Sequence, residues 1–354
     1  MSSRALIWLS AALAALIVLA IVGQRQTGPE TFEAEAIFLP GLMEELDSVE
    51  GIEIAQGGNE RVATLQRDES GWRVAEKNGY RADLTKVRHS LLGLAEARIL
   101  ERKTSNPELH SRLGVEDIED GGATGLAVTL TGPATPITVV VGDTAGEYRR
   151  YVRRAGEDQS YLIDRDPELG ETATDWLDSE ILNIEAARIR EVTLTHPDGE
   201  VLRVSKASPE QTNFTVDAIP EGRALLYESV ANVMGSVLQN LTLEDVQASA
   251  EIEDGYSVTE FRTFDGLVLT ARGIERDDGE TWVSFAAEFD PELAAESAEA
   301  EDRDTEDGET GEADIDPAAQ AQQLNDRLAG WSYRIPGYKF EQLTRRMSDL
   351  LQAQ

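Results

Sequence analysis

The feature that most constrains the fold is an order of elements that occurs twice along the chain. Each half begins with two short runs of alternating apolar and polar residues around a turn, adds a third run, and then enters a segment with apolar residues at helical spacing. The first such series extends from Gly51 to Ala95 and the second from Ile189 to Leu241. More period-two runs follow each series, separated by short turns such as Asp265-Gly266. Because short turns join antiparallel strands, the sequence predicts an α+β fold of two repeated halves, each a mainly antiparallel sheet with one principal packed helix.

The predicted strands of the two halves share this alternation and cover residues 51–54, 61–67, 72–74, 126–130, 137–141, 148–153, 160–163, 189–195, 200–204, 214–216, 258–264, 267–271 and 281–286. A first helix is expected after an N-cap at Asp83. Its apolar face consists of Leu84, Val87, Leu91, Leu92, Leu94 and Ala95. A second helix is expected where apolar residues recur every three or four positions, at Leu226, Val230, Val233, Val237 and Leu241. A closing helix is predicted over residues 340–351, with Phe340, Leu343, Met347, Leu350 and Leu351 on one side.

The N-terminus has the composition of a membrane-spanning segment. Every residue from Ala5 to Val22 except Ser10 is apolar, and 18 residues at roughly 1.5 Å each span about 27 Å, close to the thickness of a bilayer core. This length exceeds the apolar region of a cleaved signal peptide, so we expect a retained single-pass anchor, with cleavage after Gly23 as the alternative. Arg4 together with the α-amino group faces only Arg25 across the run, which points the N-terminus into the cytoplasm. The rest of the chain is then expected outside the bacterial inner membrane, in the periplasm of a Gram-negative cell.

One segment interrupts the second half. Between Asp290 and Asp316, 13 of 27 residues are Asp or Glu and only Arg303 is basic. Such a composition buries too little apolar surface to offset the entropy of ordering the chain, so a disordered loop insertion is expected over residues 290–317. The predicted organisation is an anchor (1–27), a first repeat (28–185) and a second repeat (186–354) that contains this insertion. A role of the insertion beyond solvation or adaptation to salt is left open.

Charge and composition exclude several classes of protein. The chain has 32 Lys and Arg against 67 Asp and Glu, a net charge of −35 that repels nucleic acids and anionic lipid headgroups, so we expect no nucleic-acid partner. Cys is absent from the sequence, which excludes disulfides, zinc thiolate sites, iron–sulfur ligation and thiol catalysis. The chain contains no Gly-Lys dipeptide and therefore no P-loop, and it lacks G-x-G-x-x-G and G-x-S-x-G motifs after a strand.

The side chains that could catalyse a reaction or bind a metal do not form a recognisable site in the sequence. His89, His110 and His196 have no metal-ligand spacing, and we expect His89 on a helix surface and His196 in a turn. The acidic residues Asp302, Asp304, Glu306 and Asp307 resemble an EF-hand loop, but position six counted from Asp302 is Asp307 instead of Gly, and position twelve is Ala313 instead of Glu. The five lysines are scattered, at Lys77, Lys86, Lys103, Lys206 and Lys339. We therefore expect no enzyme activity, catalytic residue, cofactor or metal site.

Aromatic residues provide the one alternative to a purely protein-binding role. Exposed together they could stack on sugars, but core packing is the expected role of most of them: Trp72, Trp176, Trp282, Trp331, Tyr148, Tyr151 and Tyr338.

Several stretches resemble the bacterial family known as domain of unknown function 4340. They are PGLMEELDSVEGIEI (40–54), SGWRVAEKNGYRADLTKV (70–87), LGVED (113–117), VVVGD (139–143), YVRR (151–154) and GWSYRIPGYKFEQL (330–343). The resemblance extends from about Ile37 to Leu350. It implies a membrane-anchored extracytoplasmic repeat domain whose genes lie beside those of gliding-motility-type ABC transporters. It supplies no catalytic residues, and the acidic stretch departs from the family pattern.

Together these observations lead to one expected function and one alternative. The chain is expected to be a non-catalytic interaction module, anchored in inner-membrane lipid through residues 5–22, that serves as an accessory component of an ABC-type export or gliding-motility-like complex. The alternative is a periplasmic binding module for a cell-envelope glycan or another ligand. The residues that bind the ligand or partner, and the oligomeric state, are left open by the sequence.

Overall fold

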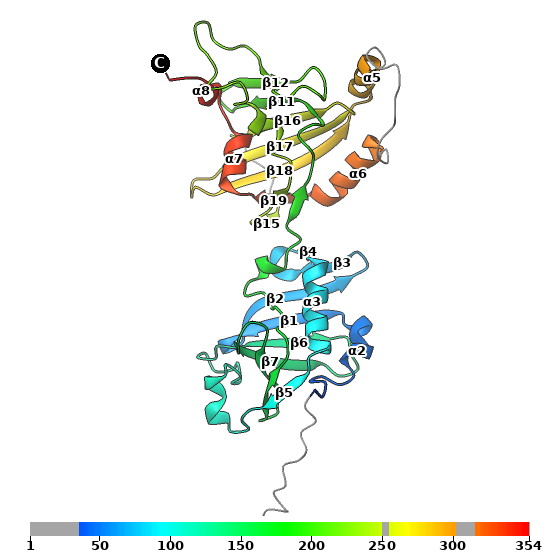
Figure 1. Cartoon of the computed structure of the whole chain (residues 1–354), viewed down its shortest axis with the longest axis vertical. Helices are drawn as coiled ribbons and strands as arrows, with labels where there is room; N and C mark the ends of the chain where they lie inside the picture. The colour runs from blue at the N-terminus through cyan, green and yellow to red at the C-terminus, as the bar shows by residue number, and fades with distance from the viewer. Residues whose placement is uncertain (1–34, 250–254, 302–315, 354) are drawn as a thin grey trace, which may run out of the picture. The chain divides into compact units, whose positions relative to one another are not determined.

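The computed structural model describes residues 35–249, 255–301 and 316–353. It is an α+β fold with two large sheets of nine and eight strands, one two-stranded sheet and a few helices (Figure 1). All the strand pairs whose register is resolved are antiparallel, as the sequence predicted. The chain forms two compact units: the described residues up to Val49 with Ile54–Glu60 and Arg88–Leu169, and Glu50–Glu53 with Arg61–Val87 and Gly170–Gln354. The predicted division at residues 185 and 186 stays a prediction.

The nine-stranded sheet has the order β4-β3-β2-β1-β6-β7-β8-β9-β5. Its strands are β1 (Gly51–Gln56), β2 (Glu60–Asp68), β3 (Gly71–Val74), β4 (Tyr80–Arg81), β5 (Ile99–Arg102), β6 (Leu126–Thr131), β7 (Ile137–Thr144), β8 (Arg150–Arg154) and β9 (Ser160–Ile163). The eight-stranded sheet has the order β13-β12-β11-β16-β17-β18-β19-β15. Its strands are β11 (Ile189–Thr195), β12 (Val201–Ser205), β13 (Thr215–Val216), β15 (Asp245–Ala248), β16 (Ser257–Thr263), β17 (Leu267–Glu275), β18 (Thr281–Phe289) and β19 (Trp331–Arg334). The small sheet pairs β10 (Glu180–Leu182) with β14 (Leu241–Thr242).

Helices are few and mostly short. The α-helices are α2 (Leu42–Glu45), α3 (Leu84–Ala95), α4 (Asn232–Gly235), α5 (Pro291–Glu301), α6 (Pro317–Leu328), α7 (Gly337–Leu343) and α8 (Met347–Leu350). Short 3₁₀ turns are η1 (Leu46–Ser48), η2 (Gly57–Asn59), η3 (Ala75–Lys77), η4 (Pro107–Arg112) and η5 (Ala173–Trp176). Within the described residues, none of these helices combines the length and the apolar character needed to cross a membrane. The predicted anchor at residues 5–22 lies outside the described residues.

The first predicted helix is confirmed as α3. Asp83 caps it, because its Oδ1 accepts hydrogen bonds from the backbone N–H groups of Thr85 at 2.8 Å and Lys86 at 3.2 Å. The predicted apolar face is only partly buried. Val87, Leu91, Leu94 and Ala95 are in the core, whereas Leu84 and Leu92 are exposed.

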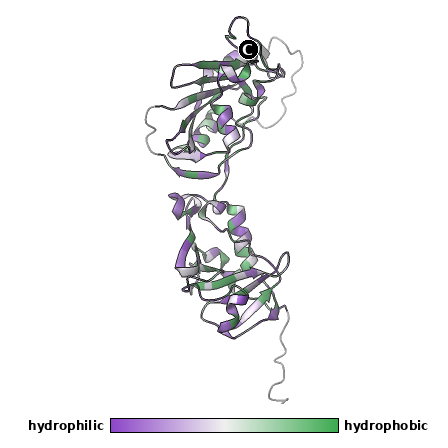
Figure 2. Ribbon diagram, turned by 90° about the vertical axis from the view of Figure 1, so that its left-hand side faces the viewer, coloured by the Kyte–Doolittle hydropathy of each residue, from purple (hydrophilic) through white to green (hydrophobic). Residues whose placement is uncertain are grey.

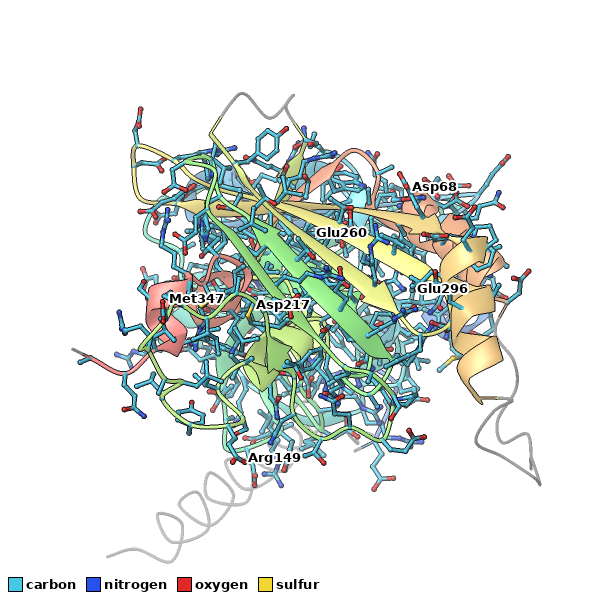
Figure 3. All side chains as sticks on the ribbon, turned by 90° about the horizontal axis from the view of Figure 1, so that it is seen from above. Asp68, Arg149, Asp217, Glu260, Glu296 and Met347 are labelled. Carbon is cyan, nitrogen blue, oxygen red and sulfur yellow. The ribbon has the colours of Figure 1, made fainter. Side chains whose placement is uncertain are left out.

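The eight-stranded sheet shows how the period-two pattern separates its two faces. Hydrophobic and hydrophilic residues alternate along the strands (Figure 2). The alternate residues Val192 and Leu194 of β11 are fully buried, whereas Glu191 of the same strand pairs with Arg203 of β12 on the other face. On that face Glu260 of β16 also pairs with Arg262 at 2.6 Å. In Figure 3 Glu260 lies over the middle of the sheet, with Asp217 and Glu296 towards its sides. One face is therefore core and the other a network of charged residues.

The predicted helix over Leu226–Leu241 is wrong. Only α4 is helical there, Leu226 is exposed, and Leu241 belongs to β14. Asn232 disfavours a regular helix here, because its side-chain Oδ1 accepts a hydrogen bond from the backbone N–H of Phe214 at 3.0 Å. Eight of the sixteen residues of the segment are Val, Ser, Asn or Gly, which are weaker helix formers than Ala or Leu. The principal helix on this sheet is α6, which packs on β18 and β17 and buries Ala321, Leu324 and Leu328.

The predicted closing helix over residues 340–351 is also wrong as one continuous element. It is divided into α7, which starts earlier, and α8, with an extended Arg346 between them at φ −102° and ψ 161°. The Asp349 side chain accepts from Arg346 N at 2.8 Å and thereby starts a new helix. The guanidinium of Arg346 forms ion pairs with Glu200 and, at 2.9 Å, with Asp198. These contacts hold the break in place.

The acidic insertion is partly helical, contrary to the expectation of disorder. Its described part forms α5, whose first N–H groups, those of Glu292 and Leu293, donate to Asp290 Oδ1 at 3.0 and 3.2 Å. Leu293 is buried. A cap, a buried leucine and a composition rich in Ala and Glu are sufficient for one short helix. Residues 302–315 lie outside the described residues.

Candidate interaction surface

Two of the three histidines, His110 and His89, contact neighbouring residues and belong to no metal site among the described residues. His110, which belongs to η4, is buried, and its Nε2 lies 2.8 Å from the backbone oxygen of Asp158. His89 lies on the exposed side of α3, where it was predicted, with its Nε2 3.4 Å from a carboxylate oxygen of Glu168. Neither histidine belongs to a group of three His, Asp or Glu side chains that could hold a metal, and the described residues contain no such group. The acidic residues compared with an EF-hand, 302–307, lie outside the described residues.

His196 makes a contact that resembles that of a nucleophile and its base. It lies in the turn after β11, as predicted, but is buried. Its Nδ1 is 3.3 Å from Ser257 Oγ, and its Nε2 is 3.3 Å from the backbone oxygen of Arg345. Ser257 is also buried, so the hydroxyl is not offered to a substrate from solvent. His196 thus connects the start of β16 to Arg345, which lies after the end of α7.

The most enclosed lysine has a structural role. Lys339 of α7 is buried, and its Nζ donates to the backbone oxygens of Val237 and Gln239 at 2.9 Å each and of Ser236 at 3.4 Å. Burial lowers the pKa of this ammonium group. Three backbone carbonyls in the turns that follow α4 thus accept hydrogen bonds from one side chain. Lys77 forms an ion pair with Asp245, and Lys103 forms one with Glu101. Lys86 donates to the backbone oxygen of Asp175, and Lys206 lies over the ring of Phe214.

The core-packing role predicted for seven aromatic residues is confirmed for three of them, Trp72, Trp176 and Trp282, which are buried. Trp331 and Tyr151 are half-buried, and Tyr148 and Tyr338 are exposed. The exposed aromatic side chains are tyrosines: Tyr148, Tyr227 and Tyr338. Tyr148 belongs to a different compact unit from Tyr227 and Tyr338. The sequence did not single out Tyr227.

The most exposed apolar group of the second unit lies on one loop, which we call the 219–227 segment. Leu226 is 47% exposed, Tyr227 57% and Ile219 37%. Upstream, Pro220 to Arg223 form a tight turn closed by a 3.0 Å hydrogen bond from Arg223 N to Pro220 O. Gly222 has φ +78° in this turn, a conformation that favours glycine. After this turn the chain runs alongside the C-terminal residues 350–352.

The C-terminal residues hold this segment in place. Leu226 N donates to Leu350 O at 2.8 Å, and Gln352 N donates to Ala224 O at 3.0 Å, on either side of an antiparallel bridge between Leu225 and Leu351. The backbone below the exposed side chains is therefore paired as in a short sheet. Because the backbone is fixed, Leu226 and Tyr227 are presented to solvent in a defined position.

The helix that precedes these C-terminal residues is itself fixed to the sheet. Met347 N, at the start of α8, donates to Glu200 Oε1 at 2.9 Å, and Figure 3 shows Met347 on this helix. Leu350, the last residue of α8, and Leu351, which follows it, are both buried. Glu221 and Glu228, which lie on either side of Leu226 and Tyr227 in the sequence, are exposed, and Arg223 between them donates to Gln352 O. The arrangement is an apolar pair with an acidic border, suited to a partner that offers an apolar surface with basic residues around it.

Comparison with known proteins gives one match. A family model, domain of unknown function (DUF4340), matches residues 72–258. A search of the curated proteins and a search of the solved structures found no match. The matched region includes the paired strands β11 and β12, α4 and the whole 219–227 segment. More than half of the chain is matched, and the protein belongs to the DUF4340 family.

Proposed function

We propose that this protein is a non-catalytic interaction module that binds another protein through Leu226 and Tyr227. The observation that carries the proposal is the exposure of both side chains on a backbone fixed by Leu350 and Gln352. Burying a large apolar side chain stabilises a complex by roughly 1.5–3 kcal/mol, and tyrosine is enriched among the residues that dominate interfaces. A pre-positioned pair also loses little conformational entropy on binding.

The partner in this proposal is a component of an ABC-type export or gliding-motility-like complex. The module is held at the bacterial inner membrane by residues 5–22 and projects into the periplasm as two related α+β halves. Support for this placement comes from the apolar run in the sequence and from the family resemblance. The engagement of Lys339 and His196 in internal contacts agrees with a role in binding rather than catalysis.

The test is affinity purification of the full chain from its native membrane, with partners identified by mass spectrometry. Recovery of an ABC permease or ATPase subunit is expected with the wild type. The double variant Leu226→Ser with Tyr227→Ser should lower that recovery at least about tenfold, because it removes most of the apolar contact. Val201→Ser is the matched control, since Val201 is 55% exposed in the same unit but lies on β12.

Two results would count against the proposal. Equal recovery with the double variant and the control would show that the 219–227 segment is not the contact. Repeated absence of any transporter component from the wild-type sample would refute the proposed partner. In that case the envelope-glycan alternative is tested with Tyr338→Ser, because Tyr338 is an exposed aromatic outside the segment. Cosedimentation with isolated cell-wall glycan that this variant abolishes would favour the alternative.

A further inference from the structure

The turn between β11 and β12 offers two carboxylates at one end of the eight-stranded sheet. The turn covers residues 196–200, and it is closed by hydrogen bonds from His196 N to Glu200 O and from Gly199 N to His196 O, 2.9 Å each. Asp198 Oδ1 also accepts from Glu200 N at 3.1 Å. The side chains of Asp198 and Glu200 therefore extend from a turn whose backbone is fixed.

Arg346 joins these two carboxylates. Its Nη1 lies 2.9 Å from Asp198 Oδ2 and also pairs with Glu200. The other oxygen of Glu200, Oε1, accepts from Met347 N at 2.9 Å, so this carboxylate binds both the guanidinium and the first backbone N–H of α8. Hydrogen bonds with Glu200 and then with Asp198 raise the pKa of Arg346 above its ordinary value. Figure 1 shows α8 beside β12, which begins directly after Glu200.

The other end of α8 reaches the 219–227 segment. We call residues 346–352 the C-terminal segment. The backbone oxygen of Leu350, the last residue of α8, accepts from Leu226 N at 2.8 Å. Gln352 donates from its backbone N and from its side-chain Nε2 to the backbone oxygens of residues 224 and 225, at 3.0 Å each. One short segment thus contacts the turn at its start and the proposed binding surface at its end.

The polar contacts of the C-terminal segment have only these two destinations. Within the part of the chain that the structure describes, its hydrogen bonds and ion pairs with other segments go to the turn or to residues 223–226. Leu350 and Leu351 are buried, but burial of apolar surface is not directional. The directional contacts that set the position of α8 on the sheet are those at its N-terminal end. Because Leu350 follows Arg346 by roughly 6 Å of helix, a shift at one end moves the other.

We propose that Arg346 is a positioning residue for the 219–227 segment, and that it acts through the two carboxylates of the turn and the C-terminal segment. This inference rests on the proposed function, because it assigns the control of that same surface. The three charged side chains are 32–56% exposed, so dissolved salt screens their attraction. High ionic strength therefore loosens the C-terminal segment, and with it the backbone of Leu226 and Tyr227, while the sheet stays folded.

Hydrogen exchange at single-residue resolution on the full-length chain tests the assignment without a partner. The amides of Leu226 and Gln352 report on the C-terminal segment, and those of β16, in the middle of the eight-stranded sheet, report on the sheet. At about 10 mM salt, Arg346→Met should raise the exchange rates of the first two amides roughly three- to tenfold and leave those of β16 unchanged. At about 1 M salt the difference from the wild type should fall below about twofold, because the wild type then also loses the attraction.

Arg345→Met is the matched control for this experiment. It removes the same charge one position earlier, but the side chain of Arg345 forms no hydrogen bond or ion pair with any residue that the structure describes, so wild-type exchange is expected. Arg346→Lys keeps the charge without the planar fork and should give an intermediate rate. Equal exchange at Leu226 in the Arg346→Met and Arg345→Met proteins would overturn the proposal. An equal rise at β16, or a difference that does not shrink with salt, would overturn it as well.

The consequence for binding is measured by the affinity purification described above. Arg346→Met should lower the recovery of the partner roughly threefold or more, because the surface is no longer held in place before binding. Added to the double variant Leu226→Ser with Tyr227→Ser, it should lower recovery no further. A further loss would mean that Arg346 contacts the partner directly, and would contradict the positioning role. If the wild type recovers no partner, the proposed function fails, while the exchange rates still decide the role of Arg346.

Discussion

Replacement of Lys339 by methionine tests whether one buried ammonium group stabilises the turns that follow α4. The change keeps most of the apolar stem and removes the charge with its donors to the backbone oxygens of Ser236, Val237 and Gln239. Two of the three contacts are short, 2.9 Å each, and a hydrogen bond to a charged group contributes roughly 1.5–3 kcal/mol. Burial of the ammonium offsets part of this sum. We expect a net loss of about 3 kcal/mol, equivalent to a fall in Tm of roughly 6–12 °C.

The control for this change is Lys206→Met. Lys206 is as buried as Lys339, 9% against 8% exposed, but its Nζ lies 4.7 Å from the centre of the Phe214 ring. That contact is worth roughly 0.5–2 kcal/mol, so the control should lose less stability. Urea unfolding followed by tryptophan fluorescence measures both. A Lys339→Met protein that unfolds at the same urea concentration as the wild type would refute the assigned role of the ammonium group.

The pH dependence of the Lys339 effect has a definite sign. Burial lowers the pKa of Lys339 in the folded protein below the ordinary value of 10.5. Between the folded pKa and 10.5 the unfolded chain binds a proton that the folded protein lacks, so the stability of the wild type rises with pH in this window. The methionine variant has no such group. The difference in unfolding free energy between wild type and variant should therefore widen as the pH is raised towards 10.5, and a difference that narrows would contradict this assignment.

Two further substitutions test close packing and a buried charge. Gly235→Ala should destabilise the protein by roughly 1–3 kcal/mol, measured as a lower urea midpoint, because the added Cβ would lie 2.4 Å from a ring carbon of Phe214. Arg153→Met should cost roughly 3 kcal/mol, measured by thermal unfolding, because Nε of this buried arginine donates to Val115 O at 2.6 Å and Nη2 pairs with Asp117 at 2.5 Å. A melting temperature unchanged by the second substitution would show that these contacts contribute nothing to stability.

The strands could be predicted because alternation and turn residues are local signals. The hairpin of β17 and β18 illustrates this: its residues were expected at 267–271 and 281–286 and form Leu267–Glu275 and Thr281–Phe289. Alternation fixes which side chains face the core, so burial of Leu269 and Phe285 followed directly. The sequence placed the C-terminal ends of both strands too early. A strand continues as long as a neighbouring strand pairs with it, and this depends on the whole sheet.

The error at residues 226–241 has a different origin. Val230, Val237 and Leu241 are buried, as the apolar spacing indicated, whereas Leu226 is exposed and Val233 is half-buried. Spacing of three and four residues does not by itself specify a helix, because successive turns can bury the same positions. Here the side chain of Asn232 ties the segment to Phe214 N, a contact 18 residues away in sequence that no local pattern reveals.

The contacts that shape the 219–227 segment, and those that join β4 to β19, lie still further apart in the chain. Leu226 was expected on a buried stripe, and it is exposed because the backbone beneath it pairs with Leu350 and Gln352. Tyr80 and Tyr333 come together only when β4 approaches β19. Neither arrangement has a signature in sequence spacing, since each depends on which elements meet in three dimensions.

The acidity of the chain and the exposure of Leu226 and Tyr227 are physically compatible. An apolar pair in solvent favours self-association, but two copies with a net charge of −35 each repel one another. The exposed Glu221 and Glu228 bring this repulsion to the border of the pair itself. A partner with basic residues around an apolar surface is attracted both by the apolar contact and by the opposite charge, and salt weakens only the electrostatic attraction. We therefore expect this surface to disfavour a second copy of this chain and to favour a partner with basic residues.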